Sequence, residues 1–166
     1  MNETPIFKFA IREDLLSEKI NFVPTKAEPF ATGWDVKAAQ PDKKDIIIKP
    51  GQYFKIPLGF RAIPPEGWWF KLHPRSSSFV KKHMHNLIGI IDEHFSMEVL
   101  FAGQYIPDIA SMGKDLIIKF GEPIGQIVPI KRIEMKTEII PNKEYDDLCG
   151  KRLAIRQGGF GSTDNK

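Results

Sequence analysis

Glycine and proline interrupt this chain at short intervals, and their spacing constrains the fold more than any other sequence feature. The 166 residues include 13 glycines and 13 prolines, which separate short apolar runs. Because both residue types break helices and favour tight turns, this punctuation favours short strands joined by turns. The pattern predicts an all-β fold, a compact jelly-roll or β-clip-like barrel with few helical turns.

Individual apolar runs mark the expected strands. Residues 45–48 end at the turn 49–52, residues 53–62 end at 64–67, and residues 68–72 follow at once. Two turns so close together predict a meander of sequential hairpins. Further strands are expected at 87–91, 99–101, 116–120 and 124–130, and helical turns only within 12–20 and 143–148.

Composition limits the partners and the location. The chain is 42% hydrophobic and 27% charged, enough for one folded domain with its own core. Its net charge of +3 is too balanced for a dedicated nucleic-acid binder, although small anionic ligands remain compatible. No apolar run reaches the roughly 18 residues of a membrane helix. With Cys149 as the single cysteine and no signal-peptide pattern, we expect a cytoplasmic protein.

The histidines and the cysteine could each carry out chemistry, but each also has a simpler structural explanation. His83 and His85 would share one face of a strand near His94 and could chelate a metal, but no third ligand stands at a suitable spacing, so an exposed polar loop is the favoured explanation. Cys149 could be a nucleophile, but nothing near it in the sequence would lower its pKa. A semi-buried thiol is the alternative.

Three other segments are more informative. In residues 73–78, Arg75 offers a fork of donors and three serines offer hydroxyls, which suits phosphate, although a solvated loop would look the same. Asp92 ends an apolar strand, so it is either a partly desolvated general base or a turn aspartate. The glycine-rich tail 158–163 carries Phe160 as a stacking ring, or is a frayed terminus.

Five segments in order resemble the five motifs of the homotrimeric all-β dUTPase family, the deoxyuridine 5′-triphosphate nucleotidohydrolases. They are TGWDVKAA at 32–39, PRSS at 74–77, NLIGIIDEHF at 86–95, GEPIGQ at 121–126 and RQGGFGST at 156–163. Each segment alone is a weak signal, but five in order over nearly the whole chain are specific. The PRSS variant and the compact size also resemble phage or prophage members.

The resemblance implies a dUTP diphosphatase. Asp92 would activate a water for attack on the α-phosphorus, giving dUMP and pyrophosphate. The implied cofactor is Mg²⁺, held by the phosphates and water, with no direct protein ligand and Asp35 at most an outer-shell partner. Asn86 would read the uracil edge, and Phe95 would stack beneath the deoxyribose. The residues implied to bind the substrate are Arg75, Ser76, Ser77, Asn86, Gly89, Ile91, Phe95, Gln126, Arg156, Phe160, Gly161 and Ser162.

The resemblance also implies an assembly and a domain division. A homotrimer would share each dUTP site between subunits, in the host cytoplasm if a phage encodes the protein. Residues 1–155 would form one dUTPase-like β-barrel domain, and residues 156–166 a flexible glycine-rich lid over a neighbour's nucleotide. No nucleic acid or membrane partner is expected.

The chain also departs from the family pattern. Met97 stands where the family usually has glycine, Pro123 replaces an arginine, and Arg156 lies one residue closer to the glycine pair. These departures leave a modified deoxyuridine triphosphate open as the substrate.

Two alternatives to the diphosphatase come from other classes. The sibling dCTP deaminases have a glutamate about ten residues after the hairpin aspartate, on the logic of proton shuttling. Residues 100–103 here read Leu-Phe-Ala-Gly, without a carboxylate. The other alternative is a nucleotide-switched regulatory binding protein, against which the retained Asp92 argues.

Overall fold

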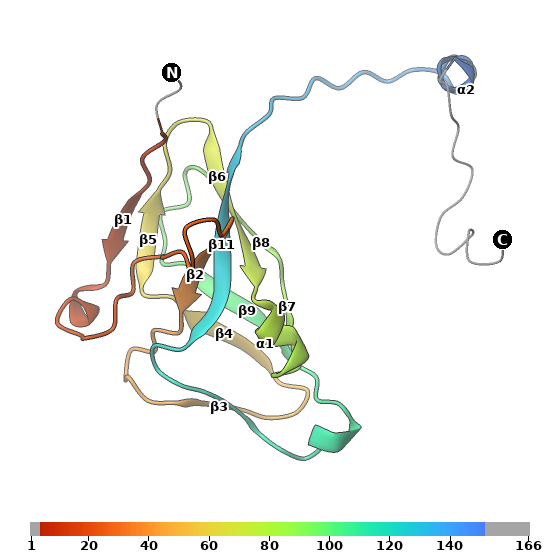
Figure 1. Cartoon of the computed structure of the whole chain (residues 1–166). Coiled ribbons are helices and arrows are strands. Elements are labelled where there is room, and N and C mark those ends of the chain that lie inside the picture. The colour runs from red at the N-terminus through yellow and green to blue at the C-terminus, as the bar shows by residue number, and fades with distance from the viewer. Residues whose placement is uncertain (1–3, 152–166) are drawn as a thin grey trace. The chain divides into compact units, whose positions relative to one another are not determined.

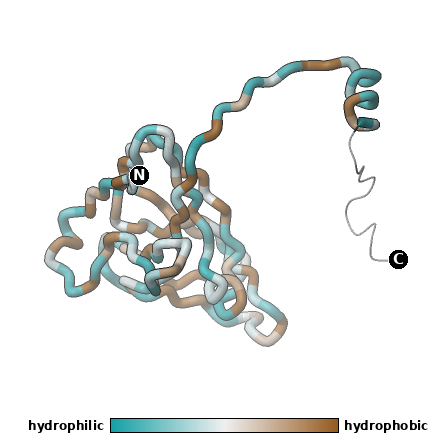
Figure 2. The backbone as a smooth tube through the Cα atoms, turned by 45° about the horizontal axis from the view of Figure 1, so that its top comes forward, coloured by the Kyte–Doolittle hydropathy of each residue, from teal (hydrophilic) through white to brown (hydrophobic). Residues whose placement is uncertain are grey.

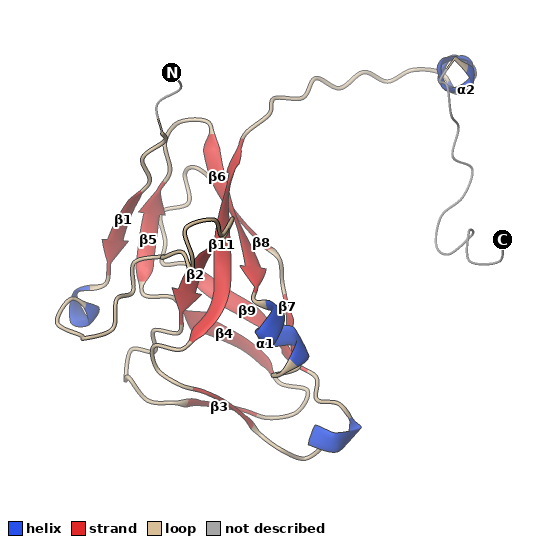
Figure 3. Ribbon diagram, viewed as in Figure 1, coloured by secondary structure: helices blue, strands red, loops and turns tan. Residues whose placement is uncertain are grey.

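The computed structural model describes residues 4–151, and strands dominate it (Figure 3). The expectation of an all-β fold is confirmed. The strands are β1 (Lys8–Ile11), β2 (Trp34–Lys37), β3 (Ile46–Ile48), β4 (Tyr53–Pro57), β5 (Phe60–Ile63), β6 (Trp68–Pro74), β7 (Met84–Asn86), β8 (Gly89–Ile91), β9 (Leu100–Tyr105), β10 (Leu116–Ile118) and β11 (Pro123–Lys131). The helices are α1 (Ser76–Val80) and α2 (Asn142–Gly150), with 3₁₀ turns η1 (Glu13–Leu15) and η2 (Ile109–Ser111).

The strands form four antiparallel sheets. The largest has the order β2-β11-β6-β8, and β4-β9-β7 form a three-stranded sheet. β1 pairs with β5, and β3 pairs with β10 (Figure 1). Within residues 4–151 these sheets are open and no barrel closes, so the jelly-roll-like form of the predicted fold is the one observed.

The predicted meander is wrong. Strands β3, β4, β5 and β6 follow one another closely in the sequence, but none pairs with the next. The run 53–62 is two strands because the chain turns at Gly59, whose φ of +75° favours glycine. The amide of Leu58, on the other side of this break, donates to the carbonyl of Val99 at 3.0 Å. Each strand therefore pairs with a partner distant in sequence, which turn signals do not encode.

Alternating apolar residues build the core between the sheets. Phe54 and Ile56 point inward from β4, while their neighbours Tyr53 and Lys55 are exposed. The same alternation gives the tube in Figure 2 its repeated change between hydrophobic and hydrophilic colour. The core cluster consists of Val36, Ala38, Ile48, Phe54, Ile56, Leu58, Phe60, Ala62, Phe70, Leu72, Met84, Val99, Phe101, Tyr105, Leu116, Ile118, Ile124 and Ile127.

The two predicted helical segments have different outcomes. Residues 12–20 form only the short turn η1, and Arg12, directly before it, donates to Asp14, to Glu98 and to the carbonyl of Ala39. The hydrogen bond with Asp14 raises the pKa of Arg12 and lowers that of Asp14. The prediction of a helix within 143–148 is confirmed by α2.

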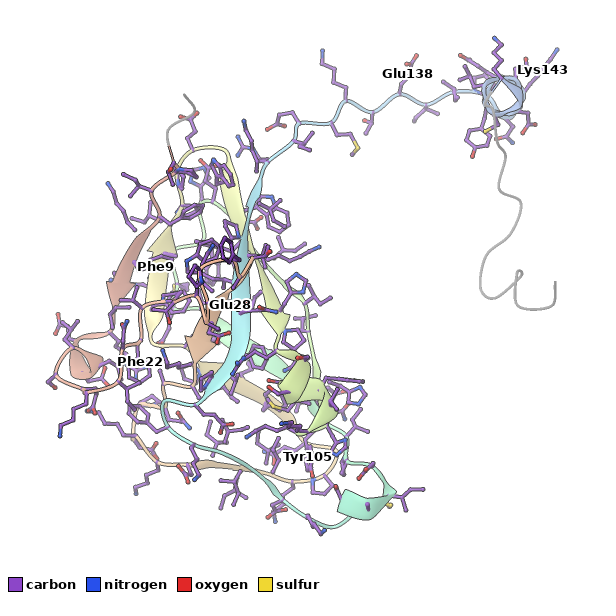
Figure 4. The ribbon with its side chains drawn as sticks, viewed as in Figure 1. Phe9, Phe22, Glu28, Tyr105, Glu138 and Lys143 are labelled. Atoms are coloured by element: carbon purple, nitrogen blue, oxygen red, sulfur yellow. The ribbon has the colours of Figure 1, made fainter. Side chains whose placement is uncertain are left out.

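Aromatic side chains reinforce the packing at two places labelled in Figure 4. Phe9 meets Phe60 edge to face, with ring centroids 5.6 Å apart. Phe22 packs against Phe120 beside the small second cluster that includes Leu15. β1 and the loop after η1 are thereby attached to the rest of the fold.

Contacts divide the chain into two units at the boundary between Ile133 and Glu134. The described part of the second unit, which carries Glu138 and Lys143 in Figure 4, includes α2, and α2 buries no residue. The predicted boundary between 155 and 156 lies outside the described residues and stays a prediction. No helix in residues 4–151 is long and apolar enough to cross a membrane.

Truncating one core ring should measure how much stability the packing supplies. Phe101 is completely buried, so Phe101→Ala should lower the free energy of unfolding by about 3–5 kcal/mol through lost transfer energy and a cavity. Phe30→Ala, which truncates a phenylalanine that is 94% exposed, is the control and should change it by less than about 0.5 kcal/mol. Urea denaturation at one protein concentration measures both, and equal effects would contradict this core.

Candidate active site

Strand β11 brings three of the five segments together. Gln126, near its start, lies opposite Asp35 of β2 on one side and opposite His73 of β6 on the other. The strand β6 leads directly into Arg75, whose Nε lies 3.3 Å from the Asp35 carboxylate. Asp35, Arg75 and Gln126 therefore form one polar cluster, which we call the phosphate cluster after its predicted role.

Gly33 and the half-buried Lys37 adjoin this cluster. A Cβ on Gly33 would lie 2.4 Å from Oε1 of Gln126, so glycine leaves the space that the Gln126 side chain occupies. Lys37 donates to the carbonyl of Asn21 at 2.6 Å, and burial lowers the pKa of Lys37. Sequence reasoning did not assign Gly33 a role, although the glycine preceding the aspartate of the first segment was a signal for it.

The three serines after Arg75 have different roles. Ser76 is exposed and Ser77 is half-buried at the start of α1, so both hydroxyls can meet a ligand. Ser78 is 2% exposed, and its hydroxyl donates to the carbonyl of Ile124 at 2.7 Å. The expectation that three hydroxyls serve phosphate is therefore wrong for Ser78, which instead attaches α1 to β11.

The predicted hairpin is not formed, because β7 and β8 do not pair with each other. The β7–β8 segment, residues 84–91, carries the predicted uracil-reading residues and joins two sheets. β7 pairs with β9, and β8 pairs with β6. Nδ2 of Asn86 donates to the carbonyl of Ala102 at 3.5 Å, while Oδ1 is buried without a partner among the described residues. Asn86 lines a cavity of about 1020 Å³ with Leu87 and Gly103. Its unsatisfied oxygen can accept a hydrogen bond from a ligand, as buried polar atoms rarely stay unpaired.

Asp92 and Phe95 follow β8 and lie at the surface. Asp92 is exposed, so the partial desolvation expected for it is not provided by its own chain. It lines a cavity of about 250 Å³ together with Trp69. Phe95 is 38% exposed and lines a separate cavity of about 500 Å³ with Phe9.

Asp92 and the phosphate cluster lie at opposite ends of β6. Ile91 pairs with Phe70, so the antiparallel register brings Asp92 beside Trp69, at the start of β6. From there to Arg75 the strand covers about 20 Å at roughly 3.3 Å per residue. Asp92 is therefore not next to the phosphate cluster, whereas Asn86 lines one cavity with Pro74, the residue before Arg75. Gly89 and Ile91 lie between them on β8. Arg156, Phe160, Gly161 and Ser162 lie outside the described residues.

Metal ligands do not gather in the described part of the chain. No group of three His, Cys, Asp or Glu side chains in residues 4–151 could hold a metal ion. His83 instead lies 3.8 Å from Asp108, and Cys149 is a half-buried thiol on α2. A magnesium ion prefers oxygen ligands and keeps several waters, so the single Asp35 carboxylate of the phosphate cluster suits the outer-shell role expected for it.

Comparison with solved structures identifies the class of fold. The dUTPase of Streptococcus mutans superposes with a TM-score of 0.65 at 22% identity, covering 78% of this chain and 98% of that one. The dUTPase from phage phi11 of S. aureus superposes with a TM-score of 0.67 at 16% identity, over 81% and 96% of the two chains. The fold is therefore that of the all-β dUTPases.

Sequence comparison identifies the family. The deoxyuridine 5′-triphosphate nucleotidohydrolase of Caulobacter vibrioides is 30% identical over 142 residues, 85% of this chain and 84% of the relative. That of Candida glabrata is 28% identical over 89% of this chain and 92% of the relative. No family model matches the chain. The chain belongs to the deoxyuridine 5′-triphosphate nucleotidohydrolase family, as its five segments predicted.

The structural role assigned to Ser78 can be separated from ligand binding by stability alone. Ser78→Ala leaves the buried carbonyl of Ile124 without its donor, so the free energy of unfolding should fall by about 1–3 kcal/mol. Ser76→Ala, on the same helix but exposed, should change it by less than about 0.5 kcal/mol. Urea denaturation of both variants is the measurement. An unchanged free energy of unfolding in Ser78→Ala would contradict the structural role of this hydrogen bond.

Proposed function

We propose that this protein hydrolyses dUTP to dUMP and pyrophosphate. The observation that carries the proposal is the β7–β8 segment and the turn after it. Asn86, whose side-chain oxygen Oδ1 has no partner among the described residues, is followed by Asp92 in the order of the third family motif. The curated relatives from Caulobacter and Candida, named as dUTP nucleotidohydrolases, support the same substrate.

Each step of the proposed reaction uses a described group. Asp92 accepts a proton from a water molecule as the water oxygen bonds to the α-phosphorus. The bond from the α-phosphorus to its bridging oxygen breaks, and pyrophosphate leaves with the electron pair. Arg75, with its planar fork of donors, and Gln126 bind the phosphate chain, with the Ser76 and Ser77 hydroxyls beside them.

The β7–β8 segment and Phe95 would select the base and the sugar. The Asn86 amide and backbone groups of Gly89 and Ile91 would read uracil, whose acceptor at position 4 becomes a donor in cytosine. Phe95 supplies a ring beneath the deoxyribose, where an added 2′-hydroxyl would not fit. Phe160, Gly161 and Ser162 of the lid and Arg156 remain part of the proposal from the sequence alone.

Magnesium is the proposed cofactor. The phosphates and water would supply most of its ligands. Asp35 is the carboxylate directly opposite Gln126, a proposed phosphate-binding residue, in the pairing of β2 with β11. When bound, the ion neutralises part of the triphosphate charge. The contact of Asp35 with Arg75 also orients that guanidinium without any metal. A phage dUTPase structure described as coordinating a structural Mg(II) ion supports this cofactor.

We further propose that the site is shared between subunits of a homotrimer. Asp92 and Arg75 of one chain are about 20 Å apart along β6, by the rise of a strand, which is far longer than a triphosphate. One nucleotide can reach both groups only when they come from different chains. Exposed apolar side chains such as Met135 and Ile139 in the second unit are compatible with burial in an assembly.

The substrate test uses purified protein with Mg²⁺ and one nucleotide at a time. Pyrophosphate release should be fast with dUTP and much slower with dCTP, dTTP and UTP, while ammonia release from dCTP would instead indicate a deaminase. Asp92→Asn should lower turnover about 10²–10⁴-fold and retain binding of a non-hydrolysable dUTP analogue, because asparagine keeps the shape but cannot accept the proton. Equal turnover of dUTP and dTTP would exclude the uracil assignment.

Subunit mixing tests the shared site directly. Asp92→Asn and Arg75→Ala chains, each inactive alone, should regain about a quarter of the wild-type activity when refolded together in equal amounts, because random assembly pairs intact groups in that fraction of sites. Light scattering should give three times the 18.9 kDa chain mass. Wild-type chains mixed with a chain carrying both substitutions serve as the reference. No recovery from the two inactive variants would place the site within one chain.

A further inference from the structure

We propose that Glu93 is a positioning residue that fixes the turn carrying Asp92. The inference rests on the proposed function for its effect on turnover, but the contacts themselves do not depend on it. Among residues 4–151, no hydrogen bond or ion pair holds the Asp92 carboxylate, although the amide of Phe95 donates to the Asp92 carbonyl at 3.0 Å. The direction of the carboxylate therefore depends on how firmly the backbone around it is held.

The side chain of Glu93 supplies that attachment. It is only 14% exposed, although it follows an exposed aspartate. Its Oε2 accepts a hydrogen bond from the amide of Gly67 at 3.0 Å and another from Nη1 of Arg132 at 2.8 Å. Bonds between a carboxylate and a charged donor are among the stronger ones in proteins.

The two partners of Glu93 are also bonded to each other. The amide of Arg132 donates to the carbonyl of Gly67 at 2.7 Å, so the three residues form a closed set of bonds, which we call the Glu93 clamp. Gly67 has a φ of +75° in the turn before β6, and Arg132 directly follows β11. The clamp therefore attaches the turn after β8 to the ends of the two central strands.

The clamp lies next to the reacting group. Asp92, Glu93 and Arg132 line the same cavity of about 250 Å³, together with Trp68 and Trp69. Nη1 of Arg132 donates to Glu93, so this edge of the guanidinium is engaged by Glu93. Glu93 thus holds the turn in place and binds a cation that lines the same cavity as the proposed base.

The clamp predicts a particular pattern of kinetic change. Glu93→Ala should lower kcat about 10–100-fold, the usual range for a lost supporting contact, with KM for dUTP within about twofold of wild type. Glu93→Gln still accepts from the Gly67 amide and should recover most of kcat. Glu66→Ala removes an exposed carboxylate from the same turn and is the matched control, with kcat unchanged.

Two further measurements separate positioning from general damage. Arg132→Ala should lower kcat like Glu93→Ala, and the double variant should be no worse than either, because the residues act as one unit. Amide hydrogen exchange of Gly67 and residues 92–95 in the full chain should speed up in Glu93→Ala but not in Glu66→Ala. This measurement needs no substrate, so it tests the clamp even if dUTP is not hydrolysed.

Other results would overturn the role proposed for Glu93. Unchanged kcat in Glu93→Ala, or a loss of kcat shared by Glu66→Ala, would overturn the positioning role. A raised KM with no recovery in Glu93→Gln would assign Glu93 to substrate binding or to general stability instead. If Glu93→Ala does not fold, unchanged kcat and unchanged exchange in Arg132→Ala would overturn the clamp.

Discussion

The pairing of β6 with β11 is the interaction on which the other features depend. This ladder runs from Gly125 opposite Pro74 to Lys131 opposite Trp68. At the Pro74 end, the ladder brings Gln126 to the exit of β6, where Arg75 begins the phosphate cluster. At the Trp68 end, it brings Arg132 to the turn at Gly67, where Glu93 is attached. A register shift of one residue would turn Gln126 to the opposite face of the sheet and dissolve both arrangements.

The opposite edges of β6 and β11 then receive the remaining parts of the site. β2 pairs with the outer edge of β11 and contributes Asp35, and β8 pairs with the outer edge of β6 and leads into Asp92. Close packing keeps these strands at a fixed separation: the buried ring of Phe101 would lie 2.8 Å from a Cβ on Gly125. The positions of the polar groups are thus set by apolar contacts on the other side of the same strands.

Sequence reasoning reached the types of element but not their pairing, and its assignment of site residues stays a prediction. β-branched runs such as 46–48 are recognisable as strands because their composition and the turn signals beside them are local. β1 and β2 were missed, since four residues such as those of β1, Lys8–Ile11, carry too little periodicity. The roles of Ser78 and Glu93 could not be predicted, because each depends on a partner far along the chain: Ile124 in one case, Gly67 and Arg132 in the other.

The distance between the two ends of β6 has a genetic consequence. If sites are shared, each chain lends its Asp92 to one site and its Arg75 to another, so one defective copy of the gene affects products of the healthy copy. An allele that removes Asp92 spoils one site per chain, whereas an allele that removes both groups spoils two. An allele that removes both groups but still folds should therefore leave less activity than an allele that fails to fold, whereas an allele that removes Asp92 alone should leave the same activity as one that fails to fold.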